Sequence, residues 1–221
     1  YKYCIMEVKG VDAIMLENYL KETYGYNEPI FVNELKFDKM TDNALRQYIT
    51  RLVKNGQLVR YDTGIYYFPK KSRILKKSYL DPQKVISRKY IQNSLDTFGY
   101  FTGAIFANQL GLTTQMPATI EIVTNKESTN GRTVTIGNLT VRIKRPAITV
   151  TPQNAAVLQF LDAVNQAEKY SELSQKETIQ ILINYVRGSG FTQEDLSSVV
   201  PAMTGYTAKK LIEWRIIYAF T

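Results

Sequence analysis

The chain has 221 residues, of which 44% are hydrophobic and 22% are charged, so it can bury one or two cores and is ordinary for a globular protein. It contains no histidine and a single cysteine, which excludes histidine-dependent catalysis, most zinc sites and an internal disulfide bond. The net charge of +8 is uneven, because residues 70–89 hold eight basic residues and one acid.

The first part of the chain is predicted to contain two helices and a short strand. Apolar residues along one side predict a helix over residues 11–23. Gly25 and Pro29 follow it and prevent the helix from continuing. Residues 30–31 are predicted as a short strand, and residues 32–37 as a second helix whose apolar side chains turn inward.

The third helix is the best-marked element of this region. Thr41 is a suitable N-cap, and Lys54-Asn55-Gly56 is a helix stop, with a cation near the last carbonyls and a glycine that can adopt a left-handed conformation. Apolar residues recur three and four apart, the spacing of a buried stripe: Leu45, Tyr48, Ile49 and Leu52. The polar residues fall mostly on the other side and form a solvent face.

Two short alternating segments, residues 58–61 and 65–68, are predicted to form a β-hairpin after the third helix. The loop at residues 62–64 has a glycine where a tight turn needs one, and Pro69 ends the second strand because it has no amide to donate. A short helix, a longer helix and a hairpin in this order are typical of a winged helix-turn-helix, which we place at residues 1–69.

The solvent face of the third helix is the candidate DNA-binding element. Arg46 has a fork of donors that suits guanine, whereas Asn43 and Gln47 suit the edge of adenine. Thr50 could meet a base or a phosphate, and the remaining cations are expected to contact the backbone or an adjacent minor groove. The residues predicted to bind DNA in this domain are Asn43, Arg46, Gln47, Thr50, Arg51, Lys54 and Arg60. The alternative is a protein-interaction module that does not bind DNA, which the nine basic and nine acidic residues of residues 1–69 support.

A basic linker, residues 70–84, follows the hairpin. A basic stripe beside a DNA-binding motif is the expected footprint of phosphate contact. The predicted contacts in the linker are Lys70, Lys71, Arg73, Lys76 and Lys77. A solvated linker that only keeps the chain soluble is the alternative.

The second domain, residues 85–221, is predicted to be a mixed α/β domain with a helical C-terminal part. Two helices are expected over residues 85–97 and 102–109, followed by a small sheet at about residues 118–145. The expected strands are residues 119–124, 133–136 and 139–144, the last two joined by the hairpin signal Gly137-Asn138.

Helices are predicted to fill the C-terminal part, residues 153–220. They are a helix over residues 154–168, one from the capping box of Ser174 and Glu177 to near Gly188, a short one from Thr192 to Pro201, and one over residues 207–220. The fold class is therefore α+β, with an N-terminal winged helix-turn-helix followed by the mixed α/β domain and its helical C-terminal part.

Catalytic alternatives find little support in the residues. Cys4 has only Lys2 and Lys9 near it to activate a thiolate, so we treat it as a bystander. Glu121 and Lys126 have the wrong spacing for two groups on one strand face of a metal-dependent nuclease, and no partner aspartate is obvious. No apolar run approaches the roughly 18–20 residues of a membrane span, and no signal peptide is evident. We expect a cytoplasmic protein that is not an enzyme, without catalytic residues, metal or cofactor.

A run in the second domain connects the chain to a known family. It comprises Gly99-Tyr100-Phe101-Thr102-Gly103-Ala104, then residues 108–117, and then the strand at residues 119–124. With a winged helix before it and helices after it, this run resembles the AbiEi-type antitoxins of abortive-infection, type IV toxin–antitoxin systems, in an AbiEi-like branch. The resemblance covers about residues 10–165.

The resemblance implies a prokaryotic transcriptional autorepressor and antitoxin. It implies that the winged helix binds inverted repeats in its own promoter as double-stranded DNA, and that antitoxicity resides in residues 87–221. It also implies a cognate nucleotidyltransferase-like toxin, a functional rather than a stable physical partner. From the residues alone, the segment Leu110–Pro117 is a helix stop and turn that locks the packing of the second domain.

Overall fold

A computed structural model describes residues 13–37, 40–70 and 79–221, and it divides the chain into two units, Tyr1–Val85 and Ile86–Thr221. The fold is mixed α+β, with a three-stranded sheet in the first unit and a four-stranded sheet in the second. Within the described ranges, no helix is both long enough and apolar enough to cross a membrane. Cys4 lies outside these ranges. So do four of the predicted linker contacts: Lys71, Arg73, Lys76 and Lys77.

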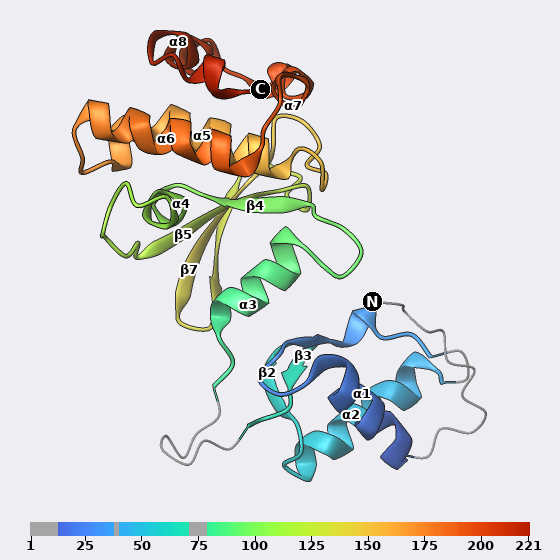
Figure 1. Cartoon of the computed structure of the whole chain (residues 1–221). Helices are drawn as coiled ribbons and strands as arrows, with labels where there is room; N and C mark the ends of the chain where they lie inside the picture. The colour runs from blue at the N-terminus through green and yellow to red at the C-terminus, as the bar shows by residue number, and fades with distance from the viewer. Residues whose placement is uncertain (1–12, 38–39, 71–78) are drawn as a thin grey trace. The chain divides into compact units, whose positions relative to one another are not determined.

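The first unit combines helices with a small antiparallel sheet (Figure 1). In chain order its elements are α1 (Ala13–Tyr24), β1 (Ile30–Phe31), the 3-10 turn η1 (Val32–Glu34), α2 (Asp42–Lys54), β2 (Val59–Asp62) and β3 (Ile65–Tyr67). β3 lies between β1 and β2, so the strand before α2 and the hairpin after it form one sheet. The short strand and the hairpin are confirmed.

The prediction of a second helix over residues 32–37 is wrong beyond the first turn. Only η1 forms, and Leu35 closes it by donating its backbone N–H to the Val32 carbonyl over 3.2 Å. Leu35 then adopts an extended conformation, with ψ of 122°, and its side chain is buried. A segment this short nucleates a helix poorly, and its buried leucine packs without a second helical turn.

α2 begins and ends as predicted. The Thr41 Oγ1 accepts a hydrogen bond from the backbone N–H of Ala44 over 3.2 Å, and Gly56 follows the helix with a left-handed φ of 70°. The four apolar residues of the predicted stripe are buried: Leu45, Tyr48, Ile49 and Leu52. They pack with α1, β1 and the hairpin in the core of this unit.

Glu17 in α1 ties this helix to the segment that follows α2. Its carboxylate pairs with Lys21 and accepts a hydrogen bond from the Gln57 side-chain amide over 2.8 Å. The Lys21 ammonium also lies 5.4 Å from the centroid of the Phe68 ring. These contacts attach α1 to the segment that follows α2 and to the end of the hairpin.

The second unit is built on a mixed sheet of order β4-β5-β7-β6, in which β5 is parallel to β7 and the other pairs are antiparallel. α3 (Pro82–Ile86) leads into it, and the π-helical turn η2 (Ser87–Ile91) follows. The sheet is formed by β4 (Gly99–Thr102), β5 (Thr119–Thr124), β6 (Arg132–Ile136) and β7 (Leu139–Lys144). The remaining elements are α4 (Ala104–Gln109), α5 (Ala155–Tyr170), α6 (Gln175–Ser189), α7 (Gln193–Ser198), η3 (Val200–Ala202), α8 (Gly205–Glu213) and η4 (Ile216–Ala219).

Helices cover this sheet in layers (Figure 1). α5 packs against β4, with α6 beside it and α8 against its outer side, while η2 packs against β4 and β5 from the other side of the sheet. An aromatic cluster joins the helices, because the Phe160 ring stacks on Tyr185 at 5.8 Å between centroids and also contacts Phe191 and Phe220. The C-terminal segment is thereby part of the core of the second unit.

β4 is not predicted by the sequence. It forms between the two predicted helices and takes only Thr102 from the second of them. The helix expected over residues 85–97 ends at Ile91, and the helix expected over residues 102–109 begins only at Ala104. The small sheet expected at about residues 118–145 therefore has a fourth strand at its edge.

Gly99 allows β4 to lie close to the backbones of its neighbours. A Cβ at this residue would lie 2.3 Å from the Tyr90 carbonyl oxygen and 2.6 Å from the Val123 carbonyl oxygen. Such close approach of two backbones requires glycine. The approach depends on chain segments on both sides of Gly99, which local periodicity does not reveal.

The other signals of the second unit are largely confirmed. β6 and β7 pair across the expected two-residue turn, and capping boxes start α6 at Ser174 and α7 at Thr192. The helix predicted over residues 207–220 is interrupted, because Arg215 takes a left-handed φ of 56° after α8. The chain then turns so that Ile216 is buried.

Candidate nucleic-acid interface

α2 presents one polar face on which the predicted residues are exposed. At about 100° per residue, four of them lie along the middle of this face: Asn43, Gln47, Thr50 and Lys54. Arg46 and Arg51 lie on its two sides, about 140° apart around the helix axis. The structure therefore brings all six predicted α2 residues to one accessible surface.

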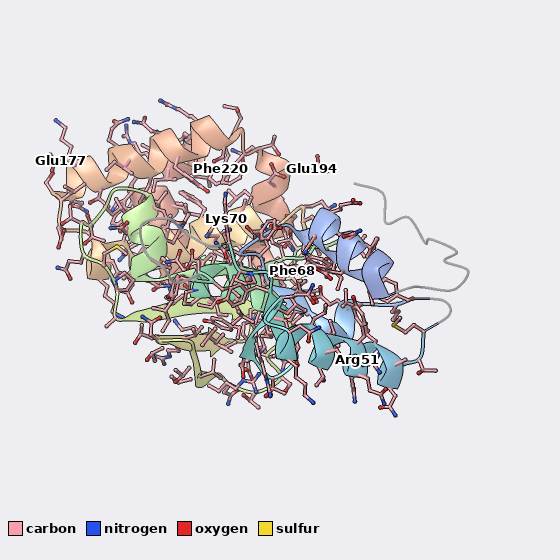
Figure 2. The ribbon with its side chains drawn as sticks, turned by 90° about the horizontal axis from the view of Figure 1, so that it is seen from below. Arg51, Phe68, Lys70, Glu177, Glu194 and Phe220 are labelled. Carbon is pink, nitrogen blue, oxygen red and sulfur yellow. The ribbon has the colours of Figure 1, made fainter. Side chains whose placement is uncertain are left out.

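The cations of this face are not neutralised by nearby acids. In the part of the chain that the structure describes, none of Arg46, Arg51 and Lys54 lies within ion-pair distance of a carboxylate. The acid of the helix, Asp42, lies in its first turn, where it suits the helix dipole. Figure 2 shows Arg51 on α2. The face has a surplus of positive charge, which suits a polyanion.

Thr50 is restricted by its own helix. Its hydroxyl donates to the Arg46 carbonyl oxygen over 2.8 Å. In this rotamer the hydroxyl is left as an acceptor, so it can receive a hydrogen bond from a base amino group but has none to give to a phosphate. Of the two expected contacts of Thr50, this geometry suits the base.

Arg60 folds over the hairpin loop. Its Nε donates to the Asp62 carbonyl over 3.4 Å, and a terminal nitrogen donates to the Thr63 hydroxyl over 3.3 Å. Both bonds are long and the residue is exposed, so the guanidinium retains donors that face solvent. Arg60 is thus held beside the tip of the hairpin.

Lys70 is the predicted linker contact that the structure describes. Its backbone N–H donates to the Asn27 Oδ1 over 3.1 Å, and Lys70 is exposed. Phe68, which precedes Lys70 by two residues, is buried (both are labelled in Figure 2). Lys70 therefore has a fixed place at the edge of the first unit. Further along the basic stretch, Lys84 pairs with Glu28, which withdraws that lysine from a phosphate-binding stripe.

The second unit contains a polar cluster that the sequence did not reveal. The Asp162 carboxylate, on α5, accepts hydrogen bonds from the Thr102 hydroxyl over 3.0 Å and from the Tyr100 hydroxyl over 3.3 Å. Gln166 donates to the same Thr102 oxygen over 3.2 Å. Burial raises the pKa of Asp162, although the hydrogen bond from Thr102, the charge of Lys144 and the hydrogen bond from Tyr100 act in the opposite direction.

Glu121, next to this cluster, has a different basic partner from the one considered in the sequence. It pairs with Lys144 on the neighbouring strand and accepts a hydrogen bond from the Tyr170 hydroxyl over 3.4 Å. Lys126 instead lies 3.8 Å from the centroid of the Phe98 ring. Although burial acts to raise it, the hydrogen bond and charge of Lys144 hold the pKa of Glu121 below its ordinary value. No group of three or more Asp, Glu, Cys or His side chains that could hold a metal occurs in the described ranges.

A large part of the chain, including α2, the hairpin and the polar cluster, is shared with other proteins. Residues 23–186 match a family described as a family of unknown function, DUF6088. The chain belongs to the DUF6088 family. The DUF6088 match ends within α6, so α7 and α8 lie beyond it. No curated protein matches the chain.

Within the DUF6088 region, hydrogen bonds hold the segment Leu110–Pro117. The Asn108 side-chain amide donates to the Thr113 carbonyl over 3.1 Å, and the Glu172 carboxylate accepts from the Thr114 backbone N–H over 3.0 Å. Glu172 follows α5, so these bonds attach the segment to the turn between α5 and α6. This agrees with a structural role as a turn that locks the second unit.

Proposed function

We propose that the first unit is a winged helix-turn-helix that binds double-stranded DNA through α2. The element order α1, β1, η1, α2, β2, β3, with β3 between β1 and β2, supports this assignment because it is the order of a winged helix. In this assignment η1 stands in place of the helix before the recognition helix, and the β2–β3 hairpin is the wing.

The exposed polar face of α2 is the observation that carries the proposal. The helix has 13 residues and spans about 20 Å, and a major groove is about 12 Å wide. With this face toward the groove floor, the side-chain amides of Asn43 and Gln47 meet base edges. Arg46 and Arg51 point toward the two groove walls, where a guanidinium reaches a phosphate or an outlying guanine.

We further propose that the chain is a transcriptional autorepressor and antitoxin of the AbiEi type rather than an enzyme. The resemblance of the run at residues 99–124 to these antitoxins supports this role. The first unit then binds inverted repeats in its own promoter, and the second unit carries the antitoxic function. Its toxin, resembling a nucleotidyltransferase, is a functional partner without a stable complex.

A protein-interaction module that does not bind DNA is the second candidate. The nine basic and nine acidic residues of residues 1–69 favour it, because non-specific affinity for DNA comes from a surplus of cations. It predicts that α2 and its cations have no effect on affinity for any duplex.

Binding of the full-length protein to the DNA upstream of its own gene separates the two candidates. The Arg46→Ala/Arg51→Ala variant is expected to lose about 2–4 kcal/mol of binding free energy with an unchanged melting temperature. A Lys176→Ala/Arg187→Ala variant, which loses the same charges from exposed positions on α6, is the matched control. Fluorescence anisotropy at two salt concentrations provides the affinities. Equal affinities of the wild type and both variants would reject DNA binding by α2.

A further inference from the structure

We propose that the second unit has a phosphate-binding site formed by Arg142, Lys169 and Thr133, beside the ion pair of Lys144 with Glu121. Its ligand is a phosphate ester, either a free nucleotide or the backbone of a single-stranded nucleic acid. The site lies wholly within the second unit and does not depend on DNA binding by α2.

The strand register places one side chain from each strand in a row across the sheet. Thr102 pairs with Glu121, Glu121 pairs with Arg142, and Arg142 pairs with Thr133. Residues paired directly across neighbouring strands share a face of the sheet. α5 covers the Thr102 end through the hydrogen bond with Asp162, whereas Arg142 and Thr133 at the other end are exposed.

α5 adds a third cation to this row. Asp162, Gln166 and Lys169 are four and seven residues apart, so they lie on one face of the helix. The first two form the hydrogen-bond network with Thr102. Lys169 continues the line, donates to the Tyr170 hydroxyl over 2.9 Å, and acts electrostatically on Glu121. The charges of Arg142 and Lys169 both act on Glu121, which the strand register pairs with Arg142.

The charges of this cluster do not balance. Lys144 is paired with Glu121, which leaves Arg142 and Lys169 without an ion-pair partner among the residues that the structure describes. Even when Asp162 is ionised, the cluster has three cations and only two carboxylates. The cations are Arg142, Lys144 and Lys169, and the carboxylates are Glu121 and Asp162. The C-terminal end of α5 compensates the charge of Lys169 only partly, since helix-dipole effects are small at exposed sites.

The available donors suit a phosphate group. Arg142 offers a planar fork, Lys169 offers an ammonium group, and the Thr133 hydroxyl lies beside Arg142 in the register. These donors come from three elements, β7, α5 and β6, and their number matches the several oxygens of a phosphate better than the two of a carboxylate. A phosphate bound there also relieves the repulsion between Arg142 and Lys169.

Calorimetric titration of the full-length protein tests the site with two probes, AMP and a single-stranded hexathymidylate without a terminal phosphate. All proteins carry Arg46→Ala and Arg51→Ala, so that α2 does not contribute. In this background, Arg142→Gln with Lys169→Gln is expected to weaken binding roughly tenfold or more. The matched control is Lys176→Gln with Arg187→Gln, and the melting temperatures of both proteins verify that they are folded.

Each outcome decides the proposal. A loss of AMP affinity in the site variant and not in the control supports the site and identifies a small phosphate ester as its ligand. A loss confined to the oligonucleotide supports the site and identifies a nucleic-acid backbone. Equal affinities of the site and control variants for both probes, or no binding by the parent protein, would overturn the proposal. Since every protein lacks the α2 arginines, none of these results bears on DNA binding by the first unit.

Discussion

The backbone of Gly103 lies against the side chain of Glu121, so that a Cβ at residue 103 would lie 3.2 Å from the Glu121 Cδ. Gly103 also has φ of 68°, in the left-handed region that favours glycine. It joins β4 to α4, next to Thr102, which binds Asp162. The side chain of Glu121 thus lies against the start of α4, while its carboxylate pairs with Lys144.

Gly103→Ala is expected to destabilise the second unit by about 1–3 kcal/mol, because both the left-handed φ and the contact with Glu121 oppose a side chain. Trp214, the single tryptophan of the chain, is buried in this unit, so its fluorescence follows the unfolding of this unit in denaturant. Gly188→Ala in α6 is the control. Its Cβ would meet no atom within 4 Å, so it should gain about 0.5–1 kcal/mol. Wild-type stability of Gly103→Ala would contradict the close approach.

Asp162→Asn is expected to remove a pH dependence from the stability of the second unit. Because the folded pKa of Asp162 is raised, protonated Asp162 favours folding. This contribution is fully present below the unfolded pKa and is lost as the pH rises through the folded pKa. Asparagine still offers an acceptor to Thr102 and Tyr100 but carries no charge. The unfolding free energy from Trp214 fluorescence, measured from acid to neutral pH, should therefore fall more steeply for the wild type. Parallel curves for the two proteins would refute the raised pKa.

Thr41→Ala is expected to cost the first unit about 1 kcal/mol, because the Ala44 N–H loses its acceptor at the start of α2. Thr41→Ser retains a hydroxyl and serves as the control. Far-UV circular dichroism reports both units, whereas Trp214 lies in the second. The dichroism curve should shift to lower denaturant for the alanine variant while the fluorescence curve does not. Coinciding dichroism curves for the alanine and serine variants would mean that the cap contributes nothing.

α2 could be predicted from the sequence because its signals are local. The cap at Thr41, the apolar spacing and the stop at Gly56 all lie within one short segment, and the exposed face follows from the buried one. β4 could not be predicted in this way. It depends on the approach of Gly99 to the backbones of Tyr90 and Val123, one of which lies in a strand that comes later in the chain.

Groups of functional side chains could likewise be predicted where their contacts are local in sequence, but not where the contacts join distant segments. Six of the DNA-binding candidates share α2, so their spacing alone brings them together. Glu121 instead meets Lys144 across two parallel strands, 23 residues away, and Asp162 meets Thr102 from 60 residues away. Such contacts depend on strand order, which the sequence pattern did not contain, and Lys126 was the nearer but wrong basic partner.

Replacing four lysines of the basic linker by glutamine is expected to lower the salt dependence of DNA binding: Lys70, Lys71, Lys76 and Lys77. Each lysine bound to a phosphate of duplex DNA releases condensed counterions, so the slope of log K against log salt falls by up to about 0.9 for every such lysine replaced. Lys70 supports this expectation, because its backbone is fixed to Asn27 and its exposed side chain lies next to the hairpin that we propose as the wing.

The control for this experiment is Lys176→Gln with Arg187→Gln, which lowers the net charge through two exposed residues of α6. If the linker binds phosphates, the slope decreases more per charge removed in its variant than in the control. If the linker is only solvated, the two decreases per charge agree, and the whole electrostatic contribution to DNA binding falls to the cations of α2 and the wing. In that case Arg46→Ala with Arg51→Ala should flatten the remaining slope, since these arginines and Lys54 are the cations that α2 presents.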